Sequence, residues 1–186
     1  MKKIWTLALL ALFLAGCATT SATRSSDGFR DPDGKVAQVP MYSAQRGYPH
    51  IVVFIREQAF AAYNADGTLA NYNGQLLKGF ATTGGLGNET PIGTFPIIFR
   101  KADHFSSEFK DNEGQGLPMP FTLRFTERGH ALHAGYHYDR RGNKLQSHGC
   151  VRVGKRELAG ALFAWVGDRD VKVIVSHGVQ LHYASR

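Results

Sequence analysis

The sequence predicts a mostly β, α+β fold that contains a single helix. Short apolar runs rich in β-branched residues recur along the chain, and turns of glycine, asparagine and aspartate separate them, which is typical of successive strands. The 21 glycines among 186 residues favour turns and close backbone approaches over long helices. One segment, 155–166, spaces its apolar residues as a helix does, at Leu158, Leu162, Phe163 and Val166.

The strands follow from these runs in order. The first, Ile51–Ile55, is a continuous β-branched run of the kind found in buried strands, and the Asp-Gly pair in Asn64–Gly67 indicates a hairpin turn. Between the fourth and fifth strands, segment 101–116 is polar and poorly periodic, so we expect a long surface loop or a short helix there, a place where lids often occur. The predicted strands are 51–55, 59–63, 75–82, 95–100, 121–125, 131–133 and 171–175.

The net charge narrows the classes of partner. The formal charge is +7 at pH 7, which suits an anionic partner. The basic residues form no block and no stripe with interleaved aromatics, so nucleic acid is not an expected partner. An anionic wall polymer or a membrane surface fits the charge better.

The N-terminus has the pattern of an export signal. Met1–Lys3 is basic and 4–15 is almost wholly apolar, too short to span a membrane and typical of a signal-peptide core. The segment Leu14–Cys17 resembles the bacterial lipoprotein signal, in which the leader is removed before a cysteine that then carries the lipid. The resemblance implies a signal peptide over 1–16, lipidation at Cys17 and an anchor on the periplasmic side of the envelope.

The residues after this cysteine set the domain boundaries. Residue 18 is alanine rather than aspartate, which by the same resemblance favours the outer membrane. Residues 17–45 are rich in Ser, Thr, Asp, Gly and Pro, so we expect a flexible tether there. The remaining chain is expected to form one domain over 46–178 with a short tail at 179–186.

The hexapeptide Ser147–Arg152 gathers the residue types of a nucleophilic acyl-transfer site. Cys150 is the only cysteine besides Cys17, so the body of the chain has no internal disulfide, and a leftover cysteine in an exported protein is a candidate reactive thiol. A free thiol titrates at about 8.5 and needs a base or a cationic neighbour to attack as a thiolate.

Histidines near this cysteine are the candidate bases. His148 is adjacent in sequence, but its ring need not face the sulfur. His133 closes the apolar run 131–133, so its backbone is fixed and its ring can be aimed. We favour it over His130 and His137, which lie in more turn-like surroundings.

Other parts of the hexapeptide suit substrate binding. The backbone amides of Gly149 and Cys150 are candidates for an oxyanion hole, since glycine permits a close approach to the reacting carbonyl. Arg152 lies on the same side of a strand as Cys150 by alternation and is expected to bind a carboxylate of the substrate. Ser147 is assigned to substrate binding as well, with turn capping through its hydroxyl as the simpler alternative.

These residues resemble the L,D-transpeptidase catalytic domain family of bacterial cell-wall enzymes. That family combines an apolar run ending in histidine, a spacer, and Ser/Thr-His-Gly-Cys followed by an apolar residue and Arg or Asn; this chain has Ala131–His133 and Ser147–Arg152. Thr90–Phe95 matches the family's Thr-Pro-x-Gly-x-Phe, and Pro118–Phe121 resembles the segment before the histidine. The resemblance covers about 48–176 and implies a β-sandwich or barrel-like catalytic fold with one helix after the cysteine.

The resemblance also implies a reaction. Cys150 would attack the bond between a diamino acid and the terminal D-alanine of a peptidoglycan tetrapeptide stem, leaving a thioester. His133 would act as base and then acid, oriented by the backbone carbonyl of Ala134, while His148 and Arg152 shape the pocket. An amine of a neighbouring stem (a 3–3 cross-link) or a lysine of a wall-anchored lipoprotein would take the acyl group. No metal or organic cofactor is implied.

Three alternatives stay open at this point. A carboxypeptidase or hydrolase with the same residues would pass the acyl group to water, trimming D-alanine or releasing a wall-linked lipoprotein. A non-catalytic wall-binding lipoprotein would keep the fold as an adhesive module, although a binder has no use for a free thiol in an oxidising compartment. His130, His133, His137, His148 and Cys150 hold enough donors for zinc, although their spacing matches no regular zinc pattern.

Overall fold

A computed structural model describes residue 42, residues 44–136 and residues 146–178. The predicted signal peptide, Cys17, most of the tether, His137 and the C-terminal tail lie outside this part of the chain. In chain order the elements are β1 (His50–Phe54), β2 (Ala59–Tyr63), β3 (Asn71–Tyr72), β4 (Gln75–Leu76), β5 (Lys78–Phe80), β6 (Gly93–Pro96), β7 (Phe99–Lys101), β8 (Phe105–Lys110), β9 (Gly116–Pro118), β10 (Thr122–Arg124), β11 (Ala131–His133), β12 (Val151–Arg152), α1 (Arg156–Val166) and β13 (Lys172–Ser176).

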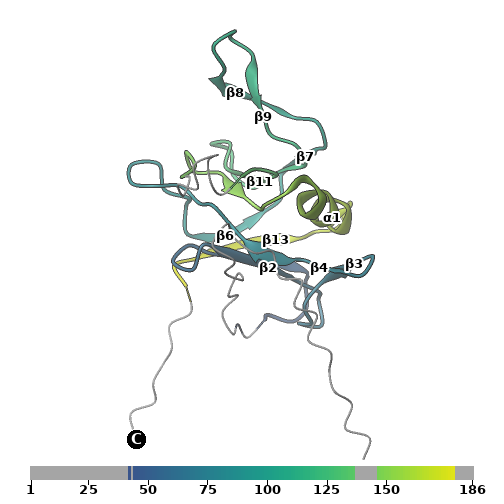
Figure 1. Cartoon of the computed structure of the whole chain (residues 1–186). Coiled ribbons are helices and arrows are strands. Elements are labelled where there is room, and N and C mark those ends of the chain that lie inside the picture. The colour runs from purple at the N-terminus through teal and green to yellow at the C-terminus, as the bar shows by residue number, and fades with distance from the viewer. Residues whose placement is uncertain (1–41, 43, 137–145, 179–186) are drawn as a thin grey trace, which may run out of the picture.

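Two open sheets form the body (Figure 1). A five-stranded sheet has the order β5-β2-β1-β13-β6, with β1 and β13 parallel and the other neighbours antiparallel. A four-stranded sheet has the order β12-β11-β10-β7, with β11 and β12 parallel. The prediction of a mostly β fold with a single helix is confirmed for the described residues, and neither sheet closes into a barrel.

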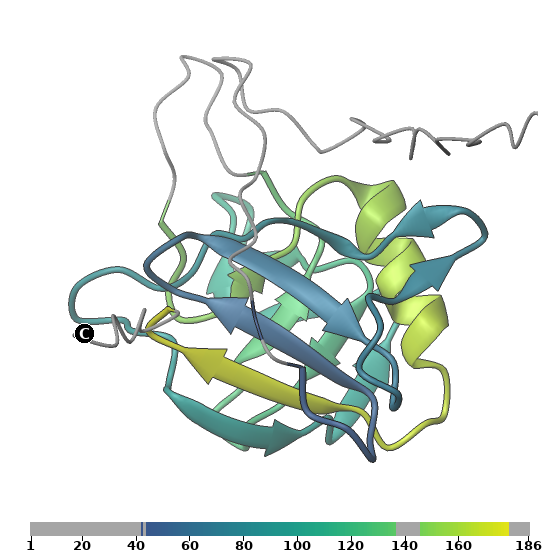
Figure 2. The ribbon, with the colours of Figure 1, turned by 90° about the horizontal axis from the view of Figure 1, so that it is seen from below.

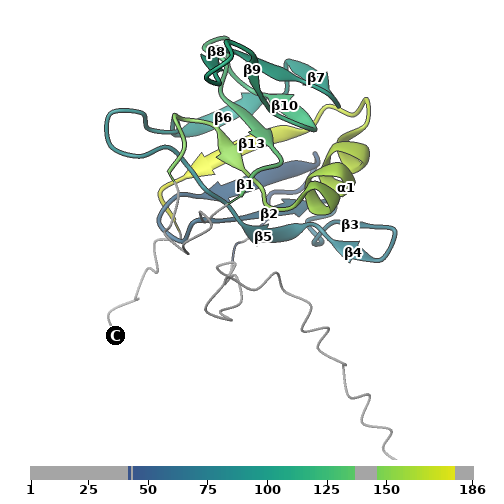
Figure 3. The same ribbon diagram turned by 45° about the horizontal axis from the view of Figure 1, so that its top comes forward.

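The main core lies between these two sheets. Ile51 and Val53 of β1 and Phe60 of β2 point to it from the five-stranded sheet, and Leu132 and Val151 come from the other sheet. The helix covers the same side of the five-stranded sheet, as the turned view shows (Figure 3), and adds buried residues at its apolar positions, among them Leu158, Leu162, Trp165 and Val166. Burial of this apolar surface is the main stabilising contribution to the fold.

The five-stranded sheet is buried on its outer face too. The alternate residues of β1 and β2, such as Val52 and Phe54, form a second cluster there, and Tyr42 and Ala44 pack against it. Figure 2 looks onto this face. Every residue of β1 and β2 is therefore buried, which explains why the sequence of β1 is a continuous apolar run rather than an alternating one.

Two predicted strands are divided in the structure. The run 95–100 belongs to two strands in different sheets: β6 pairs with β13, whereas the amide of Ile98 already donates to the carbonyl of Arg124 at 2.8 Å and β7 pairs with β10. The run 75–82 contains β4 and β5, which also lie in different sheets. Apolar periodicity alone does not reveal where a strand leaves one sheet for another, so these two boundaries were predicted wrongly.

The segment expected as a loop or short helix is a β-hairpin instead. Strands β8 and β9 pair antiparallel and extend away from the body at the top of Figure 1. Asp111 closes the turn, because its carboxylate accepts the amides of Glu113 and Gln115 at 3.0 and 2.8 Å, and Gly114 adopts a positive φ of 80°. The side chains of β8 are half-buried or exposed, so the strand lacks the apolar run by which strands are detected.

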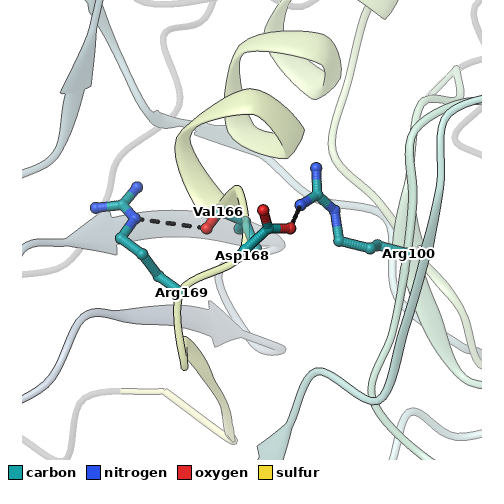
Figure 4. A network of polar contacts seen from close by, with 4 residues as sticks. All are labelled: Arg100, Val166, Asp168 and Arg169. Carbon is teal, nitrogen blue, oxygen red and sulfur yellow. Dashed lines mark hydrogen bonds and ion pairs between the residues drawn. The ribbon is translucent and has the colours of Figure 1, made fainter.

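The helix ends in a set of polar contacts. Gly167 has a positive φ of 50°, and its amide donates to the carbonyl of Phe163 at 3.2 Å. Arg100 of β7 donates to the carboxylate of Asp168 at 2.7 Å, and Arg169 donates to the carbonyl of Val166 at 3.4 Å (Figure 4). These contacts tie the end of α1 to the four-stranded sheet. No helix in the described part of the chain is long and apolar enough to cross a membrane.

Candidate active site

The parallel pair β11–β12 brings the candidate cysteine and histidine together. Its register places Leu132 opposite Val151 and His133 opposite Arg152. Leu132 and Val151 face the main core. Because side chains alternate along a strand, His133 and Arg152 face the other way, and so does Cys150, two residues before Arg152.

The turn before β12 is tightly organised. The hydroxyl of Ser147 donates to the carbonyl of Cys150 and accepts the amide of Gly149 at 3.2 Å. Gly149 has a positive φ of 105°, and a Cβ there would lie 2.7 Å from the ring of His130. Glycine is thus required both by the backbone conformation and by the packing of that ring. The hydroxyl of Ser147 therefore caps the turn that precedes Cys150, as the simpler of the two alternatives for this residue expects.

Thr90 joins this turn to a second loop. Its side chain is buried, accepts the amide of Gly84 at 2.9 Å and donates to the carbonyl of Gly149 at 2.8 Å. The segment before Gly84 runs along the other side of the hexapeptide: Thr82 and Arg152 exchange two backbone hydrogen bonds of 2.9 Å, and the amide of Ser147 donates to the carbonyl of Thr83 at 3.1 Å. The turn 147–150, here called the cysteine turn, is therefore held by Thr90 on one side and by the segment before Gly84 on the other.

His133 is buried and held in one orientation. Its Nδ1 lies 2.8 Å from the carbonyl of Ala134, and because a carbonyl only accepts, Nδ1 carries the proton and Nε2 is left as a free acceptor. Burial lowers the pKa of His133 from 6.5 to about 4; the bond to Ala134 opposes this shift, and the charge of Arg152 adds to it. The ring is therefore a neutral imidazole at neutral pH.

Cys150 is half-buried and is protonated at rest. Burial raises the pKa of its thiol above 9.0, while the amide of Ala131 and the charge of Arg152 lower it and the charge of Glu108 raises it. The thiol lies 3.8 Å from the carbonyl of Gly129. A protonated thiol needs general-base assistance to attack a carbonyl, and the neutral imidazole of His133 lines the same cavity.

Arg152 lies against a glycine that sequence reasoning did not single out for this purpose. A Cβ on Gly135 would come within 2.7 Å of the Arg152 side chain. The backbone of Gly135 is held close to the end of the hexapeptide strand, because its amide donates to the carbonyl of Gly154 at 3.0 Å. Burial lowers the pKa of Arg152 from its ordinary value. The glycine therefore leaves room for the guanidinium at the wall of the site.

A cavity of about 390 Å³ holds most of the candidate residues. Cys150, His133 and Arg152 line it together with Ser147 and His148. Ala134 and Gly135, which follow β11, line it as well, and the β8–β9 hairpin contributes Ser106, Phe109 and Leu117. The sequence analysis predicted none of the hairpin contacts.

Phe109 links the hairpin to the hexapeptide. Its ring stacks on that of His148 with 4.5 Å between the centroids. His148 is exposed and lines the cavity beside Cys150, but the stacking directs its ring toward β8. The structure thus distinguishes the two histidines that line the cavity: His133 is buried and held by the carbonyl of Ala134, whereas His148 is exposed and stacks on Phe109.

His130 lies on the other side of the cysteine turn. Its Nδ1 is 2.8 Å from the hydroxyl of Thr126, and burial, with a contribution from the charge of Arg128, lowers its pKa. The described residues contain no group of three or more His, Cys, Asp or Glu side chains arranged to hold a metal ion.

The bridge made by Thr90 gives a testable prediction. Thr90→Val keeps the shape of the side chain but leaves the half-buried amide of Gly84 and the buried carbonyl of Gly149 without this partner, so we expect a loss of about 1–3 kcal/mol in the free energy of unfolding. Urea denaturation measures it. Thr94→Val, at an exposed position of β6, is the matched control and is expected to stay within about 0.5 kcal/mol of the wild type. Equal midpoints for the two variants would contradict the role given to the bridge.

Comparisons with known proteins agree with the fold. An L,D-transpeptidase from Stackebrandtia nassauensis superposes with a TM-score of 0.60 at 20% identity, covering 76% of this chain and 62% of that one. An L,D-transpeptidase from Mycobacterium smegmatis gives 0.52 at 22% identity, with 69% and 58% covered, and the catalytic domain from Enterococcus faecium gives 0.53 at 21%, with 69% and 96% covered.

The chain thus spans less than two thirds of the length of the first two structures, and at these identities the likeness shows the fold. No curated protein matches the sequence. The model of the YkuD family, described as the L,D-transpeptidase catalytic domain, matches residues 48–175, well over half of the chain. The chain therefore belongs to the L,D-transpeptidase catalytic domain family.

Proposed function

We propose that this protein is a cysteine L,D-transpeptidase that acts on peptidoglycan stem peptides. The observation that carries the proposal is the placement of Cys150 and His133 in one cavity by the β11–β12 pair, with Nδ1 of His133 bonded to the carbonyl of Ala134. That bond fixes the tautomer of the ring and leaves Nε2 to act as the base, as a nucleophile–base–orienter arrangement requires.

The first half of the reaction follows from the two protonation states. Nε2 of His133 takes the proton of the Cys150 thiol as Sγ attacks the carbonyl between the diamino acid and D-alanine. The protonated ring then gives that proton to the leaving amine, D-alanine departs, and a thioester remains on Cys150. The low pKa of His133 makes its imidazolium a strong acid toward the leaving group.

The oxyanion formed during attack needs backbone donors. The amide of Gly149 already donates to Ser147 at 3.2 Å, a long bond that would have to be shared. The amide of Cys150 has no partner among the described residues, so we propose it as the main donor, with Gly149 in support. Arg152 is proposed to hold a substrate carboxylate, and His148 with Phe109 to form the rim.

The envelope location and the acyl acceptor are parts of the proposal as well. The lipoprotein-like segment ending in Cys17 supports a lipid anchor at the periplasmic face of the outer membrane, with 17–45 as the tether. The acceptor amine belongs to a second stem peptide or to a lysine of a wall-anchored lipoprotein. The proposed steps use only groups of this chain and of its substrates.

The function is tested with purified tetrapeptide muropeptides and the chain that starts after Cys17. Mass spectrometry of the products should show cross-linked dimers that have lost one D-alanine, and Cys150→Ala should yield none. Tripeptides without dimers would make water the acceptor and favour the carboxypeptidase. Unchanged substrate would contradict the proposal and favour a wall-binding module.

The base assignment predicts a pH profile. Because the pKa of His133 is about 4, the ring stays neutral as the pH falls from 7 to 5, and D-alanine release should stay on a plateau there and decline only toward pH 4. With a histidine that titrates near its ordinary pKa of about 6.5 as the base, the enzyme would already lose activity below pH 7.

Replacing the proposed base tests the same assignment: His133→Ala should slow D-alanine release by about 10²–10⁴-fold. His130→Ala and His137→Ala should leave D-alanine release measurable. Loss of release in either of these variants, with release retained in His133→Ala, would refute the assignment of His133 as the base.

A further inference from the structure

The turn between β1 and β2 contains a residue in a strained backbone conformation. Gln58 has a φ of 48°, in the left-handed region that glycine adopts freely and that other residues rarely enter. Such a conformation costs free energy and persists only where the surrounding contacts fix it, and residues of this kind cluster at functional sites. Gln58 does not line the cavity of the candidate active site, so any role in that site must act through other residues.

The hydrogen bonds of Gln58 join its own turn to the segment 81–83. Its amide donates to the carbonyl of Ile55 at 3.3 Å, and its carbonyl accepts the amide of Ala81 at 2.8 Å. The side-chain Nε2 donates to the carbonyl of Ile55 at 2.7 Å and to the hydroxyl of Thr83, while Oε1 accepts the amide of Thr83 at 3.2 Å. Both ends of the side-chain amide are therefore used, and both bind Thr83.

Thr83 connects Gln58 to the cysteine turn. It is buried, and its carbonyl accepts the amide of Ser147 at 3.1 Å. The hydroxyl of Ser147 in turn donates to the carbonyl of Cys150 and accepts the amide of Gly149. A continuous series of hydrogen bonds thus leads from the side chain of Gln58 to the backbone of the nucleophile.

The same segment also supports β12. Gln58 accepts the amides of Ala81 and Thr83, the residues on either side of Thr82. The amide and the carbonyl of Thr82 pair with Arg152 at 2.9 Å. The turn between β1 and β2 is therefore the support on which segment 81–83 rests, and a shift of this segment would displace the cysteine turn relative to His133 on β11.

We propose that Gln58 is a positioning residue of the active site: its side-chain amide clamps Thr83 and thereby holds the cysteine turn in place for attack by Cys150. This inference rests on the proposed function. Gln58 touches neither the cavity nor the reacting atoms, so it should affect the rate of the chemical step rather than the binding of substrate. A misplacement of about 1 Å in a catalytic group can cost about 10²-fold in rate.

The proposal also accounts for the strained backbone. Glycine would relieve the positive φ but has no side chain, and asparagine tolerates this conformation but is one methylene shorter. Neither residue carries an amide that reaches Thr83 from this turn. Glutamine combines the reach with both a donor and an acceptor, which are the two groups that Thr83 uses.

Gln58→Asn is the central test, because it keeps the side-chain amide and shortens only its reach. In single-turnover experiments with a tetrapeptide donor, the maximal rate of D-alanine release should fall by about tenfold or more, while the half-saturating donor concentration stays within about twofold. Gln75→Asn makes the same replacement at an exposed position of β4, outside the cavity, and should change neither quantity. A wild-type rate in Gln58→Asn, or a change confined to the half-saturating concentration, would overturn the inference.

Gln58→Gly separates the backbone from the side chain. It relieves the strain and removes the clamp, so its rate should fall as far as that of Gln58→Asn. Asn73→Gly is the matched control, since Asn73 has a φ of 49° in the exposed turn between β3 and β4, and it should keep the wild-type rate. A loss in Gln58→Gly that Gln58→Asn does not share would contradict the proposal, because the reach of the side chain would then not matter.

A double-mutant cycle tests the link to Thr83. Thr83→Val removes the hydroxyl and keeps the amide, so it should slow release less than Gln58→Asn does. In the double variant the two losses should not add, because both break the same connection, and full additivity would refute it. Urea denaturation of each variant shows that the assays use folded protein; a lower midpoint with an unchanged rate would leave Gln58 a stabilising role alone and overturn the inference.

A measurement without substrate separates this inference from the proposed function. If the wild type releases no D-alanine, the proposed transpeptidase is refuted, and alkylation by iodoacetamide at pH 7 then decides on Gln58, because Cys150 is the only thiol in the chain that starts after Cys17. Burial raises the pKa of this thiol, and a loosened cysteine turn would relieve the burial. Gln58→Asn should therefore be alkylated about threefold faster or more than Gln75→Asn. Equal alkylation rates would overturn the inference.

Discussion

The parallel pairing of β11 with β12 is the contact on which the site depends. Its register sets Leu132 and Val151 into the core and turns His133, Cys150 and Arg152 to the cavity. A slip of one residue in either strand would send a whole set of side chains to the wrong face, so the buried core also enforces the geometry of the site. The backbone bonds from Thr82 to Arg152 hold β12 from its other edge.

Burial then decides the chemistry of the two reacting groups. The same desolvation raises the pKa of Cys150 and lowers that of His133, so the resting pair is uncharged and the proton moves only when a substrate is attacked. The hairpin β8–β9 contributes to this burial, since Phe109 lines the cavity and stacks on His148. A segment with little core of its own thus shapes the surroundings of the nucleophile.

Much of this could be predicted from the sequence. The β-branched run of β1, the apolar run ending at His133 and the helical spacing of α1 are local patterns, and the family resemblance reached the cysteine and the histidine. The hairpin was missed because its side chains are mostly exposed, and the bridge made by Thr90 was missed because it joins residues far apart in sequence. Neither depends on a periodic pattern, so only the folded chain reveals them.

The most direct test of the account is the intact mass of the protein during turnover. After brief mixing with a tetrapeptide donor and acid quenching, we expect an adduct equal to the donor less D-alanine, on the peptide that contains Cys150 and removable by hydroxylamine. The adduct should be absent from Cys150→Ala and strongly reduced in His133→Ala. D-alanine release that continues undiminished in Cys150→Ala would contradict the account, because the acyl group would then never pass through the thiol.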